Sequence, residues 1–379
     1  MRLLHRASPW RELFTHDSLP DWRQWPPLLA PLADAFERLG PTPSLAKAKT
    51  WQFTLVDALQ RLDLPAWRIS QLLSDHNDWI YRHAIIDSLN DLKGSGWGEP
   101  PVGFCVLILG SGARHESLLG PDQDNAMIID EYPDARHREI DGYFQALGER
   151  FTARLDTAGI PFCNGHVMAS WPMWRKRLSE WCEQLQLWTA DRRVKRVQQS
   201  NILFDFASVY GDVRLADALR DEVVRLMPRA GLFLDEMAVL LDEVPVALDR
   251  RGRLNGDDEG APHERAINLK RQGLMPLISA VRLLSLAHGG RSVDTQSRLA
   301  ELVSHGVMDV SRARALNAAL ERLQAIVLES QLNSLAAGRL ADGWVDMAVL
   351  DKDKHLLLRH DLQQIQSLIS LAKSASSRR

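Results

Sequence analysis

The sequence predicts an α+β protein that is mostly helical. Two features favour this class. Leucine and isoleucine recur at helical spacing over residues 51–92 and again over most of the chain after residue 213. Two short apolar runs, at residues 102–109 and 125–129, are rich in β-branched side chains and are typical of buried strands. We therefore expect a small sheet that is flanked by helices on both sides.

Residues 1–95 are expected to form an N-terminal helical region. Seven prolines in the first 50 positions divide its start into short helical pieces, because each proline removes a hydrogen-bond donor and fixes φ. Residues 51–92 then show three helical stretches, and Asp75 and Asn77 are predicted to cap the helix boundary between the second and third. Glycines and prolines between Lys93 and Pro101 predict a loop.

The middle part, residues 96–212, is expected to hold the sheet. Its predicted elements are strands over residues 102–109, 125–129 and 202–206 and an amphipathic helix over residues 136–156. Residues 213–379 are expected to form a helical bundle, with long amphipathic patterns at 308–336 and 354–373.

The composition limits the partners and the compartment. The formal net charge of -3 gives no basic excess, so nucleic acid is not favoured as a partner. The three cysteines have no CxxC spacing, which is typical of a reducing compartment. No apolar run reaches membrane-spanning length, and the N-terminus lacks the apolar core of a signal peptide. We expect a cytoplasmic protein without a membrane partner.

The chemistry is expected where the first strand ends. Gly110 and Ser111 follow that strand, and small residues there let a phosphate approach the backbone. Asp122 and Asp124 stand two residues apart at the start of the second strand, so their side chains share a face. Two carboxylates this close cost free energy unless a cation compensates them, and Mg²⁺ prefers oxygen ligands. The pattern therefore predicts a site for a nucleoside triphosphate with Mg²⁺, or with Mn²⁺ in its place.

Each half of this pattern is common by itself. Asp-X-Asp is usually a solvated turn, and Gly-Ser-Gly after a strand is often a plain turn. The combination of both, about ten residues apart and each beside an apolar strand, favours a functional site. Two other readings stay open, namely a nucleotide-binding regulatory module without turnover and a helical scaffold whose α/β part only packs.

With these residues in view, the sequence resembles a group of nucleotidyltransferases related to the N-terminal part of bacterial PII-uridylyltransferase, within the DNA polymerase β-like superfamily. The pattern of that group is Gly-Ser-X-Gly-Arg-X-Glu-Gln followed by Thr-Asp-Gln-Asp-Asn-Ala. The matching residues here are Gly110, Ser111, Arg114, Glu116, Asp122, Gln123, Asp124, Asn125 and Ala126. Ala113, Ser117 and Pro121 depart from it; they spare the carboxylates but change the phosphate loop.

The resemblance continues along nearly the whole chain. Cys163–Ala169 resembles the motif Cys-X-Gly-Gly-Val-Met-Ala, and Phe204-Asp205-Phe206 resembles the start of Phe-Asp-Phe-Arg, although Ala207 stands in the arginine position. Later residues resemble a C-terminal helical substrate-binding domain; they are Ile267–Lys270, Arg282, Thr295, Arg298 and Leu299. Members often carry regulatory CBS or cyclic-nucleotide-binding modules in front, for which we expect no room here.

The resemblance implies a polymerase β-like core with a small mixed sheet, and it implies roles for single residues. Asp122 and Asp124 would hold the catalytic metal, while Gly110 and Ser111 would contact the β- and γ-phosphates. Arg114 would bind a phosphate through its planar guanidinium, or else form a surface ion pair.

The same resemblance implies roles for further residues. Asp205 is the expected third carboxylate and base, with Asp130 as its rival. Lys270 and Arg282 would reach the nucleotide from the helical domain, or else lie on a solvated helix face. Independently of the resemblance, Cys163 is expected to be a buried thiol and not a nucleophile, because the sequence places no base beside it.

The expected reaction moves a nucleoside monophosphate from the triphosphate to an acceptor and releases pyrophosphate. The acceptor is expected to be a protein side-chain hydroxyl, as in protein uridylyl- or adenylyltransferases. The main alternative is the non-catalytic nucleotide-binding module.

Overall fold

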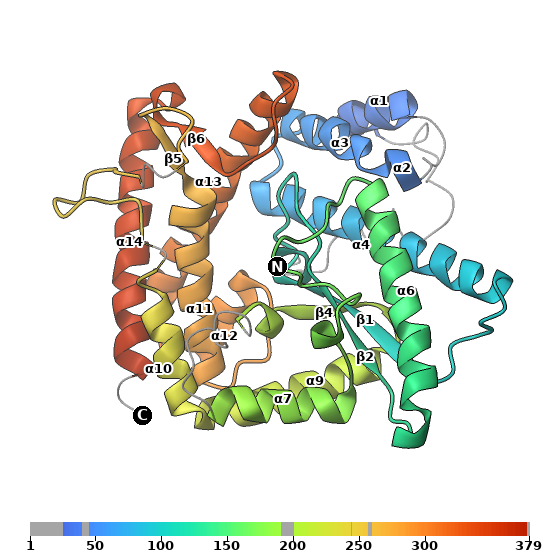
Figure 1. The fold of residues 1–379 in the computed structure, drawn as a ribbon. Helices are drawn as coiled ribbons and strands as arrows, with labels where there is room; N and C mark the ends of the chain where they lie inside the picture. Colours follow the sequence, from blue (N-terminus) through green and yellow to red (C-terminus); the bar gives the residue numbers. More distant parts are fainter. Residues whose placement is uncertain (1–25, 40–44, 191–200, 244, 257–259, 377–379) are drawn as a thin grey trace. The chain divides into compact units, whose positions relative to one another are not determined.

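A computed structural model describes residues 26–39, 45–190, 201–243, 245–256 and 260–376. Helices dominate these ranges and accompany a small mixed sheet (Figure 1), which confirms the predicted mostly helical α+β class. None of the helices in these ranges combines the length and apolarity that a membrane span requires.

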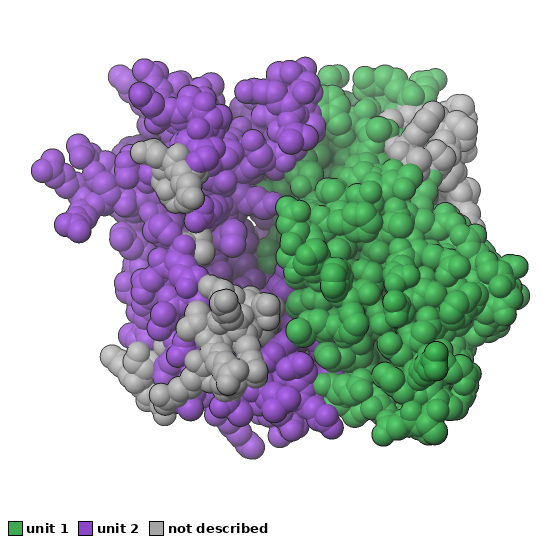
Figure 2. Space-filling view, in the orientation of Figure 1, with its two compact units in different colours: residues 1–180, 206–216 green, residues 181–205, 217–379 purple. Residues whose placement is uncertain are grey.

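The chain forms two compact units, which Figure 2 shows in different colours. Unit 1 comprises Met1–Glu180 and Phe206–Ala216, and unit 2 comprises Trp181–Asp205 and Asp217–Arg379. The chain therefore leaves unit 1, contributes to unit 2 and returns to add one more piece to unit 1.

Unit 1 begins with short helices, as the prolines predict for the part of this region that the structure describes. They are a 3-10 turn at Pro27–Leu29, α1 (Ala30–Leu39), α2 (Leu45–Ala48) and α3 (Thr50–Arg61). The long helix α4 (Ala66–Gly94) follows.

The predicted helix boundary at Asp75 and Asn77 is wrong, because α4 passes through both residues without a break. Both side chains are only 3% exposed. The side-chain oxygen of Asn77 accepts a hydrogen bond from Gln52 Nε2 at 2.6 Å, and from Lys49 Nζ at 3.2 Å. The polar side chain of Asn77 is therefore satisfied by contacts with α3 and the residue before it, and it caps no new helix.

The sheet of unit 1 has four strands in the order β3-β2-β1-β4. They are β1 (Phe104–Leu109), β2 (Asn125–Ile129), β3 (Arg175–Arg177) and β4 (Phe206–Gly211). The central strand β1 pairs antiparallel with β2 and β4, whereas β2 and β3 are parallel. Every residue of β1 and β2 is buried, which explains why both strands are apolar apart from Asn125 at the start of β2.

The third predicted strand is misplaced. Ile202–Phe204 form a 3-10 turn, and β4 begins only at Phe206. The carbonyl oxygen of Phe204 accepts from Arg220 Nη1 at 3.0 Å and from Arg298 Nη2 at 3.3 Å, so arginine side chains take the place of a strand partner. Strand β3 was not predicted, because Arg-Lys-Arg shows no apolar alternation.

Helix α6 (His137–Thr157), which follows a 3-10 turn at Asp134–Arg136, confirms the predicted amphipathic helix and packs against α4. Its predicted apolar face is fully buried; it consists of Ile140, Phe144, Leu147, Phe151 and Leu155. A Cβ at Gly148 would lie 2.8 Å from the carbonyl oxygen of Ala169, so this glycine lets the segment around Ala169 approach the helix.

Unit 2 is built mainly from helices, and the two long C-terminal patterns are confirmed as α13 and α14. Its regular helices are α7 (Leu178–Ala190), α9 (Val213–Leu226), α10 (Gly231–Leu240), α11 (Met275–Ala287), α12 (Thr295–Ser304), α13 (Val310–Ala336) and α14 (Lys352–Ser376), of which α7 and α9 begin in unit 1. Helix α11 packs against α10, α12 and α14, so it forms the centre of the bundle.

A two-stranded antiparallel sheet in unit 2 was not predicted. It consists of β5 (Ala266–Asn268) and β6 (Trp344–Asp346), and three residues are too few to show a period. A π-helical turn at Lys270–Leu274 leads from β5 into α11.

Candidate active site

A tight helical turn, α5 (Gly110–Ala113), follows β1 directly. Gly110 has a φ of 60°, in the left-handed region that favours glycine, so the chain can turn as soon as the strand ends. The N–H of Arg114 donates to the Gly110 carbonyl at 3.2 Å, and that of Glu116 donates to the Ser111 carbonyl at 2.9 Å. The first N–H groups of such a turn have no carbonyl partner within the turn, so they can donate hydrogen bonds to a phosphate oxygen.

The acidic pair lies beside this turn. Asp122 and Asp124 precede β2, and the N–H of Leu109 donates to the Asp124 carbonyl at 2.9 Å. Leu109 is the residue before Gly110, so the backbone of Asp124 runs alongside the point where β1 ends. The structure thereby brings the predicted phosphate turn and the predicted carboxylates together.

Gln123 fixes the direction of the two carboxylates. Its side chain is completely buried, and its Nε2 donates to the carbonyls of Thr152 and Ile160, both at 2.9 Å. Alternation along an extended segment then turns Asp122 and Asp124 away from this buried side. Asp122 is exposed and Asp124 is partly buried. The role of Gln123 could have been suspected from its place between two acidic residues, but its carbonyl partners lie too far along the chain to be foreseen.

A third segment, residues 161–169, runs along the acidic pair. The N–H of Gln123 donates to the Pro161 carbonyl at 2.9 Å, and the N–H of Asn125 donates to the Val167 carbonyl at 3.0 Å. The side-chain oxygen of Asn125 also accepts from the N–H of Ala169 at 2.8 Å. These bonds place Cys163, which was expected only to be a buried thiol, next to the carboxylates.

Asp122, Asp124 and Cys163 form a set of metal-ligand atoms that all lie within 4.8 Å of one another. Two carboxylates at this spacing fit a divalent cation. Cys163 is 8% exposed. Burial raises the pKa of its thiol, and the charges of Asp124 and Asp122 raise it further, whereas the backbone N–H groups of Val167 and Gly165 lower it.

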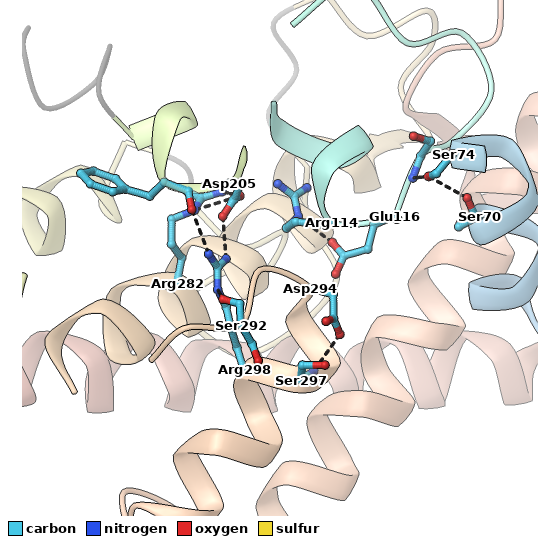
Figure 3. Close-up of polar contacts among 12 residues, drawn as sticks. Ser70, Ser74, Arg114, Glu116, Asp205, Arg282, Ser292, Asp294, Ser297 and Arg298 are labelled. Carbon is cyan, nitrogen blue, oxygen red and sulfur yellow. Dashed lines mark hydrogen bonds and ion pairs between the residues drawn. The ribbon is translucent and has the colours of Figure 1, made fainter. Parts of the chain in front are cut away.

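Arg114 is held in place by Glu116. Arg114 Nε lies 2.7 Å from Glu116 Oε2, and the two side chains are 8% and 9% exposed (Figure 3). The N–H of Ser117 donates to Ser74 Oγ at 3.2 Å, which fastens the end of the loop to α4. The alternative of an ion pair for Arg114 is thus realised, but the pair is buried and orients the guanidinium.

Helix α4 adds a second acidic cluster. Ligand atoms of Asp75, Asp78 and His115 lie within 4.8 Å of one another, with 3.7 Å between His115 Nδ1 and Asp75 Oδ1. The buried hydroxyl of Tyr81 accepts from Asn125 Nδ2 at 3.4 Å. Its pKa is raised first by burial and then by the charges of Asp124, Asp78 and Asp122, while the bond from Asn125 acts the other way. The side of α4 that bears Asp78 therefore belongs to the same negative region as the acidic pair.

Two family models match the chain. One, described as a putative nucleotidyltransferase (DUF294), matches residues 52–195; the other, described as the putative nucleotidyltransferase substrate binding domain, matches residues 231–375. The chain belongs to this nucleotidyltransferase family. No curated protein matches it. The first match contains the turn at Gly110–Ala113, the acidic pair and Cys163. The predicted nucleotidyltransferase family is therefore confirmed, whereas the relation to PII-uridylyltransferase stays a prediction.

In this nucleotidyltransferase, Asp205 lies between the two matched regions. Its side chain is completely buried and belongs to unit 2, where Figure 3 shows it beside Arg282 and Arg298. Arg282 donates to its Oδ2 through Nε at 3.0 Å and Nη2 at 2.5 Å, and Arg298 Nη1 lies 2.6 Å from its Oδ1. In this arrangement Asp205 is the counter-ion of two arginines, and its role as the third carboxylate stays a prediction.

The other predicted residues lie in different settings. Arg282 is 7% exposed and also donates to Asn201 Oδ1 at 2.8 Å, whereas Lys270 is exposed in the π-helical turn. Asp130 follows the far end of β2, about 20 Å along the strand from Asp124 at roughly 3.3 Å per residue. That separation is too large for Asp130 and Asp124 to share a cation.

Proposed function

We propose that the protein is a metal-dependent nucleotidyltransferase that moves a nucleoside monophosphate from a triphosphate to an acceptor and releases pyrophosphate. The observation that carries this proposal is the hydrogen bond between the Leu109 N–H and the Asp124 carbonyl. It lays two carboxylates with adjacent metal-ligand atoms alongside a helical turn that starts at Gly110.

Each part of the site has a role in this reaction. Asp122 and Asp124 hold the divalent cation, Mg²⁺ or Mn²⁺, which when bound neutralises charge on the α-phosphate and on the leaving pyrophosphate. The N–H groups of the turn at Gly110 and Ser111 bind the β- and γ-phosphates. Arg114, oriented by Glu116, offers a planar fork to a phosphate oxygen.

In the transfer step, a hydroxyl oxygen of the acceptor bonds to the α-phosphorus as the bond to pyrophosphate breaks. Asp205 is our predicted acceptor of the hydroxyl proton. It can take that role only when Arg282 or Arg298 releases one of its oxygens, because both oxygens are engaged. Lys270 and Arg282 remain proposed nucleotide contacts from the substrate-binding domain.

The finer assignment rests on the resemblance to PII-uridylyltransferase, from which we propose a protein side-chain hydroxyl as the acceptor. Two departures from that group's pattern are accommodated locally. Ala113 is buried in α5, and Ser117 is anchored by its backbone to Ser74. Both therefore leave the turn and the acidic pair in place.

The test compares binding and turnover. Thermal shifts with each of the four nucleoside triphosphates, in Mg²⁺ and in Mn²⁺, should show stabilisation of the parent protein, because a ligand that binds the folded state raises its apparent stability. The double variant Asp122→Ala, Asp124→Ala should lose this shift. Asp156→Ala, which removes an exposed carboxylate from α6, is the matched control and should keep it.

Release of pyrophosphate with candidate acceptor proteins then separates transfer from binding alone. Binding that persists in the double variant would overturn the site. Binding without any pyrophosphate release would favour the regulatory module.

A further inference from the structure

The proposed reaction does not use the sulfur atom of Cys163, which lies beside the acidic pair. A site made only for Mg²⁺ would present oxygen ligands, since Mg²⁺ is a hard cation. Here a thiol completes a triangle of ligand atoms with Asp122 and Asp124.

We propose that Cys163 is a third ligand of the cation held by Asp122 and Asp124, and that the site therefore binds thiophilic divalent cations such as Co²⁺, Zn²⁺ and Cd²⁺ more tightly than Mg²⁺. The inference rests on the proposed function in one respect, because it takes the acidic pair as a cation site.

The distances allow this coordination. The three ligand atoms lie within 4.8 Å of one another. The centre of a triangle with sides of that length is about 2.8 Å from each corner, so modest rotations about Cα–Cβ reach the roughly 2.0–2.3 Å of zinc–oxygen and zinc–sulfur bonds.

The sulfur is also held in position. The turn that carries Cys163 closes on itself through the N–H of His166, which donates to the Cys163 carbonyl at 3.0 Å. The same turn is tied to β2 by the N–H of Asn125, which donates to the Val167 carbonyl. Gln123 independently anchors the segment that carries Asp122 and Asp124. The acidic segment and the turn that carries Cys163 are therefore both held in place before any cation binds.

Coordination by the sulfur is coupled to the loss of its proton. When the sulfur–metal bond forms, the S–H bond breaks and its proton leaves to solvent, so binding of one cation at this site releases one proton. No oxidant or further reactant is needed.

The other two cysteines provide controls. Cys105 is buried in β1 and donates to Ser208 Oγ at 3.2 Å, and Cys182 belongs to α7 in unit 2. Neither is part of a set of metal-ligand atoms among the residues that the structure describes. Cys182→Ser is therefore the matched control for Cys163→Ser.

The experiment is a titration of the metal-free full chain with Co²⁺, followed by the near-ultraviolet absorption of thiolate-to-cobalt charge transfer. We expect the band to saturate at one equivalent in the parent and in Cys182→Ser. In Cys163→Ser and Cys163→Ala the band should disappear and Co²⁺ affinity should fall by roughly tenfold or more. Mg²⁺ affinity should change much less, and circular dichroism confirms that the variants are folded.

Two negative results have different meanings. Co²⁺ binding that depends on Asp122 and Asp124 but shows no charge-transfer band, or a band that survives in Cys163→Ser, overturns the role of Cys163 and leaves the proposed function intact. Co²⁺ and Mg²⁺ binding that is absent, or unchanged in Asp122→Asn, Asp124→Asn, overturns the cation site and the proposed function with it.

Discussion

Replacing Asp205 by asparagine tests whether this carboxylate is the counter-ion of a buried cluster. Its side chain is completely buried, and those of its partners Arg298 and Arg282 are 1% and 8% exposed. Asparagine keeps the shape but removes the charge, so two guanidinium groups lose their shared carboxylate in a region that water hardly reaches. Breaking a buried pair in this way costs about 3–5 kcal/mol.

The assay is urea denaturation at pH 7, followed by circular dichroism, with Asp212→Asn as the control. Asp212 pairs with Arg214, whose side chain is 86% exposed, so the loss of this charge should leave the midpoint of unfolding nearly unchanged. A cost for Asp205→Asn that is below about 1 kcal/mol would refute the reasoning, because it would mean that water or another group compensates the arginines.

The same variant bears on the predicted role of Asp205 as a base. Turnover measured in the absence of urea, where the folded variant still predominates, separates the two roles. Loss of turnover in folded protein supports the base, whereas retained turnover alongside lower stability leaves Asp205 as a counter-ion only.

Three further predictions concern unit 1. Gly211→Ala should destabilise the protein by more than about 2 kcal/mol, because the φ of Gly211 is 91° and a Cβ there would lie 2.2 Å from the backbone oxygen of Phe104. As a control, Gly142→Ala should stabilise the protein by about 0.5–1 kcal/mol, because Gly142 lies inside α6 with open space around it. Equal midpoints of urea denaturation for the two variants would contradict both expectations. Gln123→Leu should lower the free energy of unfolding by about 1–3 kcal/mol and weaken triphosphate binding, because the buried carbonyls of Thr152 and Ile160 lose their donor. An unchanged triphosphate affinity in calorimetry would contradict the orienting role of Gln123. Burial lowers the pKa of Lys49 to about 7. Between pH 7 and 10.5 the folded chain therefore binds fewer protons than the unfolded chain. The free energy of unfolding should rise with pH across that window, by at most about 1.4 kcal/mol per pH unit. Lys49→Met should remove this rise, and identical pH dependence of the two proteins' unfolding free energies would disprove the assignment.

Local pattern was enough for the parts of the site that follow from chain geometry. The alternation of Asp122, Gln123 and Asp124 is a property of any extended segment, and the structure has Gln123 on the buried side. The apolar run before Gly110 marked β1 because a central strand is buried on both faces.

Contacts between distant residues were out of reach of local pattern. Cys163 stands beside the acidic pair only because Asn125 bonds to Val167 and Ala169, about forty positions later. Asp205 lies next to an apolar run that resembles a strand, and only the arginines of α11 and α12 show that its neighbourhood is a buried ion cluster. Neither contact can be predicted from the pattern of residues that are close together in the sequence.

The interrupted path of the chain through unit 1 matters for anyone who cuts it or follows its synthesis. Strand β1 gains its partner β4 only after roughly a hundred more residues have been made, and the last part of that stretch, Trp181–Asp205, belongs to unit 2. A fragment that stops at residue 195, where the first family match ends, lacks β4 and leaves one side of β1 unpaired. Such an open strand edge can pair with other chains, so unit 1 is best produced with residues 206–216 still attached.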